Sequence, residues 1–303
     1  MPREIILSDI RIADDSDCFT IAEIGQNHCG SVSKCISMIA SAKQAGADCV
    51  KLQKRTNREL YTPEFYNAPY NSEHSFGKTY GEHREALEFD EAQYESIVDY
   101  CRYAGIGFAA TAFDVQAAHF LAKIGADWIK IASGDVENLP LLEEVAQLGL
   151  PVVLSTGGAR SFSRVAEALY ALSEHGSSVA VLQCTSGYPA EWEDLNLRVI
   201  EEFRAMLPHT VVGWSMHARG ISQAPVAYAL GARILEAHFT TDRYGKGSDQ
   251  AMSLEPEGFG AMVRYMQYTR QALGDAEKKR LPCESKALLK QWKNSDGKID
   301  GVG

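Results

Sequence analysis

The sequence has no excess of positive charge. Its 30 Lys and Arg residues face 40 Asp and Glu residues, which gives a formal net charge of −10 at pH 7. We therefore expect no broad basic surface for a nucleic acid. Long apolar runs are also missing and the mean hydropathy is −0.21, so no membrane-spanning helix is predicted. The N-terminal residues form no apolar signal-peptide core, which favours a cytoplasmic protein.

Paired cysteine motifs are absent as well. The seven cysteines form no C-x-x-C pair and no zinc-ligand pattern, and their number is odd. We interpret them as reduced and mostly buried thiols. Cys184 is included, because no histidine at nucleophile–base spacing is evident in the sequence. The G-x-G-x-x-G fingerprint is missing after the first predicted strand, which weighs against a dinucleotide-binding fold.

The chain does contain a regular alternation of short β-rich runs with helical stretches. The runs are rich in Val and Ile and show no one-sided polar alternation, as expected for a parallel sheet buried on both faces. Eight alternating units in one chain predict an α/β fold of the (β/α)₈ TIM-barrel type. The predicted strands cover residues 19–24, 48–54, 106–111, 127–132, 150–155, 178–184, 210–215 and 232–239.

Two segments depart from this rhythm. A polar and aromatic loop is expected over residues 55–89, between the second strand and its helix. From about residue 275 the apolar pattern dissolves. We therefore predict a barrel domain over residues 1–275 and a C-terminal tail over residues 276–303, with room for one short helix near residues 284–292.

In a (β/α)₈ barrel the active site lies at the C-terminal ends of the strands. Two lysines, Lys51 and Lys130, lie near such ends and are expected to point inward. A buried lysine needs an anion. Together with nearby hydroxyls they indicate a site for a phosphate or a carboxylate. The alternative is that each lysine pairs with an internal carboxylate such as Glu23 or Glu236. The hydroxyls are those of Thr111, Ser133, Ser155 and Ser215.

Two histidines end consecutive predicted strands. His217 and His238 are expected to lie side by side in the barrel wall, because neighbouring strands are about 4.8 Å apart. Two imidazoles beside acidic groups suit a divalent metal such as Mn²⁺, Fe²⁺ or Zn²⁺. A single histidine of this kind is more often a hydrogen-bonded structural residue. His28, in the loop after the first strand, is either a general acid–base or a polar loop residue.

Several segments form a recognisable set: IAEIGQNH (21–28), AGADCVKLQK (45–54), KIASGD (130–135), LSTG (154–157), QCTSGYP (183–189), LGAR (230–233), GSD (247–249) and SLEP (253–256). Taken together and in this order, they resemble the sialic acid synthase family, and the resemblance covers residues 1–285. Residues 76–83 and 281–284 look more like the animal-type branch of that family, which uses a 6-phosphorylated sugar.

The resemblance implies the aldol-type condensation of phosphoenolpyruvate with an aldose, giving a nonulosonic acid and phosphate. It implies Mn²⁺, or Mg²⁺ or Co²⁺, bound by His217 and His238, and a proton-transfer role for Glu23. Phosphoenolpyruvate would contact Lys51, Thr111, Lys130, Ser133, Ser155, Ser186 and Ser215. The sugar, N-acetylmannosamine, its 6-phosphate or a related aldose, would contact Gln53, Asp135, Tyr188 and Asp249. The family resemblance also implies a homodimer.

The sequence departs from the family pattern in several places. The family's small C-terminal antifreeze-like domain, which supplies an arginine to the sugar, is not recognised here. Met216, Ala237 and Gln250 replace residues that are commonly acidic or small, cationic, and histidine, respectively. We therefore expect a condensing enzyme with an unusual acceptor. Two alternatives stay open: a binding or assembly subunit that needs an antifreeze-like partner in trans, and a non-catalytic barrel that only binds phosphoenolpyruvate.

Overall fold

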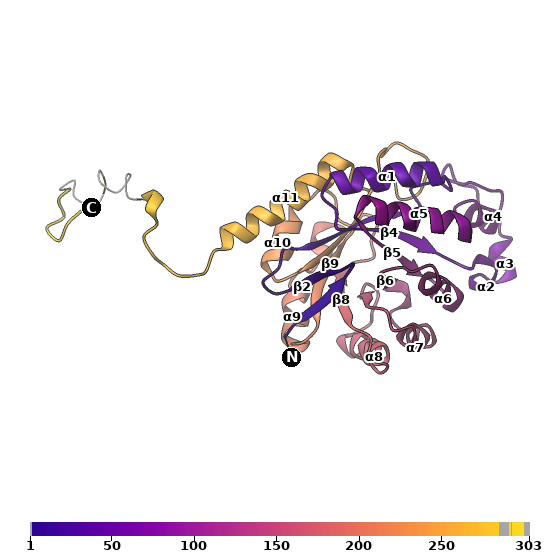
Figure 1. Cartoon of the computed structure of the whole chain (residues 1–303), viewed down its shortest axis with the longest axis horizontal. Helices are drawn as coiled ribbons and strands as arrows, with labels where there is room; N and C mark the ends of the chain where they lie inside the picture. The colour runs from indigo at the N-terminus through magenta and orange to yellow at the C-terminus, as the bar shows by residue number, and fades with distance from the viewer. Residues whose placement is uncertain (1, 285–290, 292, 300–303) are drawn as a thin grey trace. The chain divides into compact units, whose positions relative to one another are not determined.

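The computed structural model describes residues 2–284, 291 and 293–299. The chain divides into two compact units, Met1–Arg270 and Gln271–Gly303. In the first unit, parallel strands close into a barrel in the order β10-β3-β4-β5-β6-β7-β8-β9, with helices outside them (Figure 1). The predicted (β/α)₈ fold is confirmed.

Each predicted strand is present, with ends that differ by two residues at most. The barrel strands are β3 (Phe19–Gly25), β4 (Cys49–Lys54), β5 (Gly107–Ala112), β6 (Trp128–Ile131), β7 (Val152–Ser155), β8 (Val179–Cys184), β9 (Val211–Met216) and β10 (Ile234–His238). The helices that follow them are α1 (Val32–Gln44), α5 (Glu91–Ala104), α6 (Val115–Lys123), α7 (Leu139–Gln147), α8 (Phe162–Ser173), α9 (Val199–Met206), α10 (Gln223–Ala229) and α11 (Pro256–Leu273).

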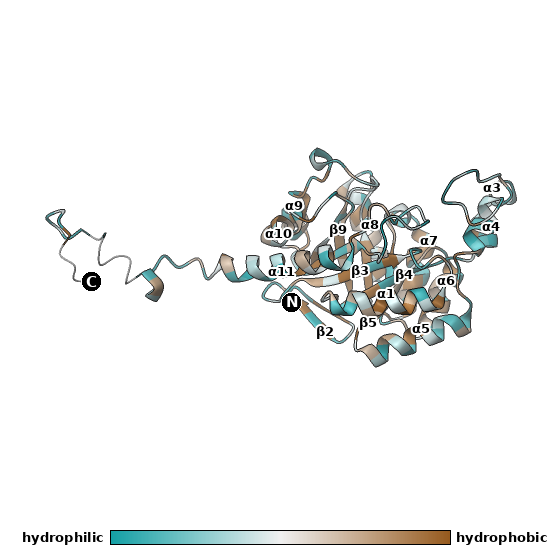
Figure 2. Ribbon diagram, turned by 90° about the horizontal axis from the view of Figure 1, so that it is seen from above, coloured by the Kyte–Doolittle hydropathy of each residue, from teal (hydrophilic) through white to brown (hydrophobic). Residues whose placement is uncertain are grey.

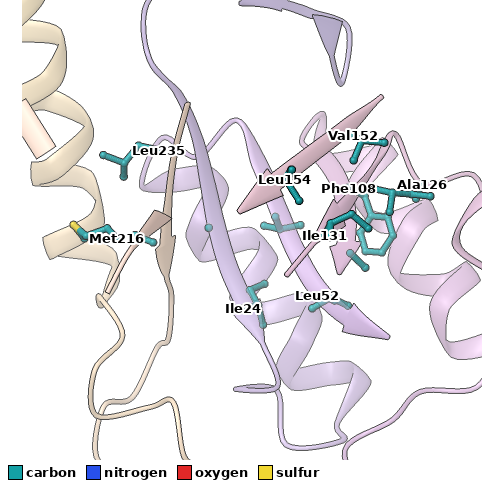
Figure 3. Packing of buried hydrophobic residues seen from close by; sticks show 14 of the residues in the cluster. Ile24, Leu52, Phe108, Ala126, Ile131, Val152, Leu154, Met216 and Leu235 are labelled. Carbon is teal, nitrogen blue, oxygen red and sulfur yellow. The ribbon is translucent and has the colours of Figure 1, made fainter. Parts of the chain in front are cut away.

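Most of the apolar core lies between the strands and the surrounding helices. Figure 2 shows brown strands inside helices whose outer faces are largely teal. Outward side chains of neighbouring strands, such as Ile131 and Leu154, pack together with Phe108 and Ala126 (Figure 3). The complete burial of Ile131 and Leu154 explains why the strands read as continuous apolar runs.

A hairpin that the sequence did not predict precedes the barrel. β1 (Glu4–Leu7) and β2 (Ile10–Ala13) pair antiparallel around Ser8 and Asp9, which both have positive φ as a two-residue hairpin turn requires. The strands are short and their turn has no glycine, so the usual sequence signal is missing. Ile5, Leu7 and Ile12 join a second apolar cluster with inward residues near the starts of the barrel strands. The hairpin therefore covers the N-terminal mouth of the barrel.

The segment after β4 is more ordered than the predicted loop. It contains the short helices α2 (Asn57–Leu60), α3 (Pro63–Tyr66) and α4 (Tyr80–Glu85). Thr79 and Glu82 form a capping box at the start of α4. The rings of Tyr61, Phe65 and Tyr80 pack against one another, with centroids 4.7 to 5.7 Å apart. This aromatic cluster joins the three helices at the C-terminal side of the barrel.

The second unit contains the end of α11 and the 3₁₀ turn η3 (Pro282–Glu284). Most of the helix predicted near residues 284–292 lies outside the described residues. Among the residues that are described, no helix is long and apolar enough to cross a membrane.

The barrel interior has no room for a larger side chain at Gly213 on β9. A Cβ atom there would lie 2.4 Å from the carbonyl oxygen of Ile234 and 2.5 Å from Leu182 Cδ2. We expect Gly213→Ala to lower the free energy of unfolding by about 1–3 kcal/mol, measured by chemical denaturation.

Gly258→Ala in α11 is the matched control. The nearest atom to a Cβ there is Leu254 Cδ2 at 3.8 Å. Alanine is also the better helix former, so this variant should be as stable as the parent or more stable. Equal effects of the two substitutions would contradict the packing argument.

Candidate active site

A cavity of about 930 Å³ lies at the C-terminal ends of the barrel strands. Every residue predicted for catalysis, phosphoenolpyruvate, sugar or metal lines it, although the residues come from all eight strands or the loops that follow them. The lining includes Glu23, Lys51, Gln53, Thr111, Lys130, Ser133, Asp135, Ser155, Ser186, Tyr188, Ser215, His217, His238 and Asp249. The structure thus brings the whole predicted set together, while the role of each residue stays a prediction.

The two lysines lie among carboxylates deep in this cavity. Lys51 Nζ is 2.6 Å from Glu23 Oε2 and donates a 2.8 Å hydrogen bond to Thr111 Oγ1. Glu236 lies between the lysines, with its carboxylate oxygens 3.8 Å from Lys51 Nζ and 3.7 Å from Lys130 Nζ. All four charged side chains are buried. Internal pairing is therefore present, but the two contacts of Glu236 exceed hydrogen-bond length and leave the lysines able to take a further anion.

Charge and burial oppose each other in this cluster. Burial lowers the pKa of Lys130, although Glu236 acts in the opposite direction. For Glu236, burial raises the pKa, but the charges of Lys130 and Lys51 lower it more, so the net direction is downward. Glu236 is therefore held as a carboxylate between two cations. The sequence suggested Glu236 only as an alternative partner for the lysines. Its position two residues before His238 places it on the same inward face, which could have identified it as a site residue.

Gln53 connects the lysine cluster to a cation that the sequence analysis missed. Its Nε2 donates a 2.9 Å hydrogen bond to Glu23 Oε1, and its Oε1 accepts a 2.8 Å hydrogen bond from Arg55 Nη2. Both oxygens of Glu23 are thereby held, one by Gln53 and one by Lys51. Arg55 directly follows β4, so its place at a strand end was the signal that could have found it.

The two histidines lie next to each other, with ring centroids 5.6 Å apart. His217 Nδ1 lies 3.1 Å from the carbonyl oxygen of Thr185. That oxygen can only accept, so Nδ1 donates its proton to it, and in the neutral form of the ring Nε2 keeps a free lone pair. His238 Nδ1 is buried without a hydrogen-bond partner among the described residues, and lies 4.0 Å from Asp249 Oδ2. The ring of Tyr188 packs on His217 at 4.3 Å.

The two imidazoles are donors of the kind that a divalent metal takes. A backbone carbonyl that accepts from one imidazole nitrogen while the other stays free is the usual support of a metal-binding histidine. His238 Nδ1 is a buried polar atom that lacks a partner within the described part of the chain. No group of three or more His, Cys, Asp or Glu side chains able to hold a metal occurs among the described residues. A metal here would keep positions open for substrate or water.

Cys184 has a histidine neighbour after all. Its Sγ lies 3.7 Å from His217 Nδ1 and accepts a hydrogen bond from Ser133 Oγ at 3.2 Å. Burial raises the pKa of the thiol, but the hydrogen bond and charge of His217 lower it more, so the net direction is downward. The thiol is buried as predicted. The sequence shows no histidine at nucleophile–base spacing because His217, just after β9, lies 33 positions away and meets the thiol only through the fold.

His28 does not belong to the lining of the cavity. It is buried, stacks on Phe89 at 4.2 Å, and its Nδ1 accepts a hydrogen bond from the backbone N–H of Gly30. Burial lowers its pKa to about 3, and the charge of Lys34 adds to this. Of the two interpretations left open by the sequence, the structural one is the better supported.

The three residues that depart from the family pattern lie outside the cavity lining. Met216 and Ala237 point outward into the core between strands and helices, where Figure 3 shows Met216 beside Leu235. Their inward neighbours along the strands line the cavity instead. Gln250 is buried in a loop, where its Nε2 donates to the carbonyl oxygen of Asn27. None of the three side chains therefore touches the cavity, and the expectation of an unusual acceptor stays a prediction.

A closed parallel barrel with lysines, carboxylates and histidines at its C-terminal mouth defines an enzyme active site of the TIM-barrel class. The chain belongs to the NeuB family, whose sequence profile matches residues 38–278. It is 40% identical over 300 residues to N-acetylneuraminate-9-phosphate synthase of Mus musculus, covering 99% of this chain and 83% of that protein.

More distant relatives agree with this assignment. The chain is 32% identical over 272 residues to N,N'-diacetyllegionaminic acid synthase of Campylobacter jejuni, covering 88% of this chain and 81% of that protein. Among solved structures, the N-acetylneuraminic acid synthetase of Leptospira borgpetersenii in complex with citrate superposes with a TM-score of 0.82 at 31% identity. That match covers 95% of this chain and 96% of the other.

Removal of the ion pair between Lys51 and Glu23 is expected to destabilise the protein strongly. Lys51→Met would leave the carboxylate of Glu23 buried beside Glu236 without its closest cation. We expect the free energy of unfolding to fall by about 3–5 kcal/mol, measured by chemical denaturation. Lys123→Met is the control, since it removes an exposed pair with Glu91 and should change little. A similar loss in both variants would disprove the proposed cost of the unpaired carboxylate.

Proposed function

We propose that this protein condenses phosphoenolpyruvate with an aldose to give a nonulosonic acid, a 2-keto-3-deoxy sugar acid, and inorganic phosphate. The acceptor is N-acetylmannosamine, its 6-phosphate or a related amino-sugar. The observation that carries the proposal is the pair of buried lysines, Lys51 and Lys130, in a cavity that also contains two adjacent histidines. The two relatives named above are synthases of such acids.

The lysine cluster has the character needed for phosphoenolpyruvate, a small substrate with a phosphate and a carboxylate. Lys51 and Lys130 supply the positive charge, and five hydroxyls surround them. Ser155 Oγ is buried and lacks a partner within the described residues, so it is free to donate to a ligand oxygen. The five hydroxyls belong to Thr111, Ser133, Ser155, Ser186 and Ser215.

The proposed reaction forms one C–C bond, forms a C–O bond between water and C2, and breaks the C–O bond between C2 and the phosphate group. C3 of phosphoenolpyruvate attacks the aldehyde carbon of the open-chain sugar, and the aldehyde oxygen takes up a proton. Water adds to C2 and gives one proton to Glu23, which balances the proton taken up by the aldehyde oxygen. Phosphate then leaves with the oxygen that it held on C2 and takes the second proton of that water, so that C2 becomes a keto group. Gln53 and Lys51 fix the Glu23 carboxylate for this step. Holding the two substrates in register inside the cavity supplies much of the rate enhancement.

We further propose that His217 and His238 hold Mn²⁺, or Mg²⁺ or Co²⁺. When bound, the metal polarises the sugar aldehyde. The carbonyl oxygen of Thr185 orients His217, and the ring of Tyr188 packs on the same histidine. Asp249, with Gln53, Asp135 and Tyr188, is proposed to position the sugar.

The setting of the enzyme is also part of the proposal. The cysteines are all free thiols, which fits a reducing compartment such as the cytoplasm. The homodimer predicted from the family resemblance stays a prediction that light scattering of the purified protein will test.

Phosphate release from phosphoenolpyruvate in the presence of Mn²⁺ tests the function directly. The acceptors are N-acetylmannosamine, its 6-phosphate, mannose and arabinose, with mass spectrometry of the product. We expect phosphate and a 2-keto-3-deoxy acid in equal amounts with an N-acetylated acceptor. Phosphate without the acid would mean simple hydrolysis and would contradict the proposal. No turnover with any acceptor, but turnover after addition of an antifreeze-like protein, would support a subunit that needs a partner.

The metal proposal has its own prediction. We expect EDTA to abolish turnover and Mn²⁺ to restore it, and His217→Ala or His238→Ala to reduce kcat by at least about 100-fold, because the metal polarises the reacting aldehyde. His119→Ala, on the exposed face of α6, is the matched control. Turnover that survives both EDTA and the two cavity variants would remove the metal from the proposal while leaving the condensation intact.

A further inference from the structure

Two arginines of the cavity lie apart from the lysine cluster and take no part in the steps described above. Arg55 directly follows β4, and the residue is only 7% exposed. Its Nη1 is buried and has no hydrogen-bond partner among the described residues. The guanidinium stacks on the ring of Phe113 at 3.7 Å, which fixes its plane. A buried guanidinium nitrogen without an acceptor indicates a place for a ligand oxygen.

The backbone beside Arg55 is held by carboxylates that do not neutralise its side chain. Glu88 Oε2 accepts from the backbone N–H of Arg55, but the side chain of Glu88 pairs with Lys54. Asp114 accepts from the backbone N–H and the hydroxyl of Thr56. The position of the guanidinium is therefore fixed by the fold, while its charge is left without a direct counter-ion within the described residues.

Arg84, on α4 of the segment that follows β4, lines the same cavity as Arg55. Its Nε and Nη2 donate to the hydroxyl of Tyr80, and its Nη1 donates to Gln26 Oε1 at 2.5 Å. These acceptors are neutral, and no ion pair of Arg84 occurs in the part of the chain that the structure describes. Burial lowers the pKa of Arg55, and the charge of Arg84 lowers it further, so the two cations are close enough to repel each other.

The other cations of the cavity differ in this respect. Lys51 and Lys130 lie beside Glu23 and Glu236. Arg160, at the rim, forms an ion pair with Glu137 through several of its nitrogens. Two neighbouring arginines that lack carboxylate partners are costly unless an anion joins them. A phosphate group, with nearly two negative charges and three acceptor oxygens, matches such a pair.

We propose that Arg55 and Arg84 form the subsite for a phosphate group on the acceptor sugar, and so select a phosphorylated aldose over its neutral counterpart. The inference rests on the proposed function, since it assigns the acceptor end of that cavity. Gln53 joins the subsite to the reacting end, because it accepts from Arg55 and donates to Glu23. Binding of the phosphate thus anchors the sugar at one end while its aldehyde faces the lysine cluster.

Steady-state kinetics with two acceptors test this subsite. At saturating phosphoenolpyruvate and Mn²⁺, phosphate release is measured against N-acetylmannosamine and its 6-phosphate for the parent protein and for Arg55→Gln, Arg84→Gln and Arg84→Lys. We expect the parent to prefer the 6-phosphate. The two glutamine variants should lose about 10- to 100-fold in kcat/KM for the 6-phosphate only, mainly through KM. Arg84→Lys should recover part of the loss.

Arg160→Gln is the matched control, because its charge is already neutralised by Glu137. It should keep the preference of the parent. Equal losses for both acceptors would mean that the arginines act only through Gln53 and would overturn the inference. A raised KM for phosphoenolpyruvate with an unchanged acceptor preference would mean that they serve the phosphate of phosphoenolpyruvate, which also overturns it.

Calorimetric titration of the Mn²⁺-loaded protein with N-acetylmannosamine 6-phosphate separates the two proposals. If no acceptor supports turnover, the proposed reaction fails, but binding of this sugar phosphate that is lost in Arg84→Gln and kept in Arg160→Gln would still support the subsite. Absence of binding by the parent protein, or equal binding by all variants, would overturn it.

Discussion

The site depends on one constraint, which is that a closed barrel must hold two lysines in its interior. Lys51 and Lys130 are both buried, and an unpaired ammonium group in such a place costs several kcal/mol. Glu23 and Glu236 offset that cost. The contact of Glu23 with Lys51 is close, whereas the contacts of Glu236 with both lysines are longer. The cluster is therefore stable enough to fold around, while the loose contacts of Lys130 and the nearby hydroxyls leave donors for an anion.

The strands meet this constraint in the same way around the barrel. On most strands the inward positions change from apolar at the start to polar at the end, as in Ile21 and Glu23 on β3 or Ile234 and Glu236 on β10. The apolar half, covered by the β1–β2 hairpin, keeps water away from the lower side of the charged cluster. Packing and chemistry are thereby separated along the strand direction, which is how one barrel supports both a firm core and an open, polar mouth.

This separation explains what the sequence could predict. Alternation along a strand is a local property, so residues such as Lys51 and His217 were placed inside the barrel from spacing alone. The same rule, applied to Met216 and Ala237, points them outward, away from the cavity. The neighbours of Cys184 and the acceptors of Arg84 depend on contacts between distant segments, and a single sequence carries no signal for those. The hairpin was missed because strands of four residues around a turn without glycine resemble an irregular N-terminus.

The segment after β4 is the part of the site that does not belong to the barrel. Its aromatic rings pack together, a capping box starts α4, and Asp114 and Glu88 hold its first residues to the barrel. Such a segment positions a side chain almost as firmly as a strand does. Since Met216, Ala237 and Gln250 do not line the cavity, acceptor choice is more reasonably assigned to residues that do, and Arg84 on this segment is among them. The barrel then serves the chemistry shared by the family, and the segment after β4 serves the choice of sugar.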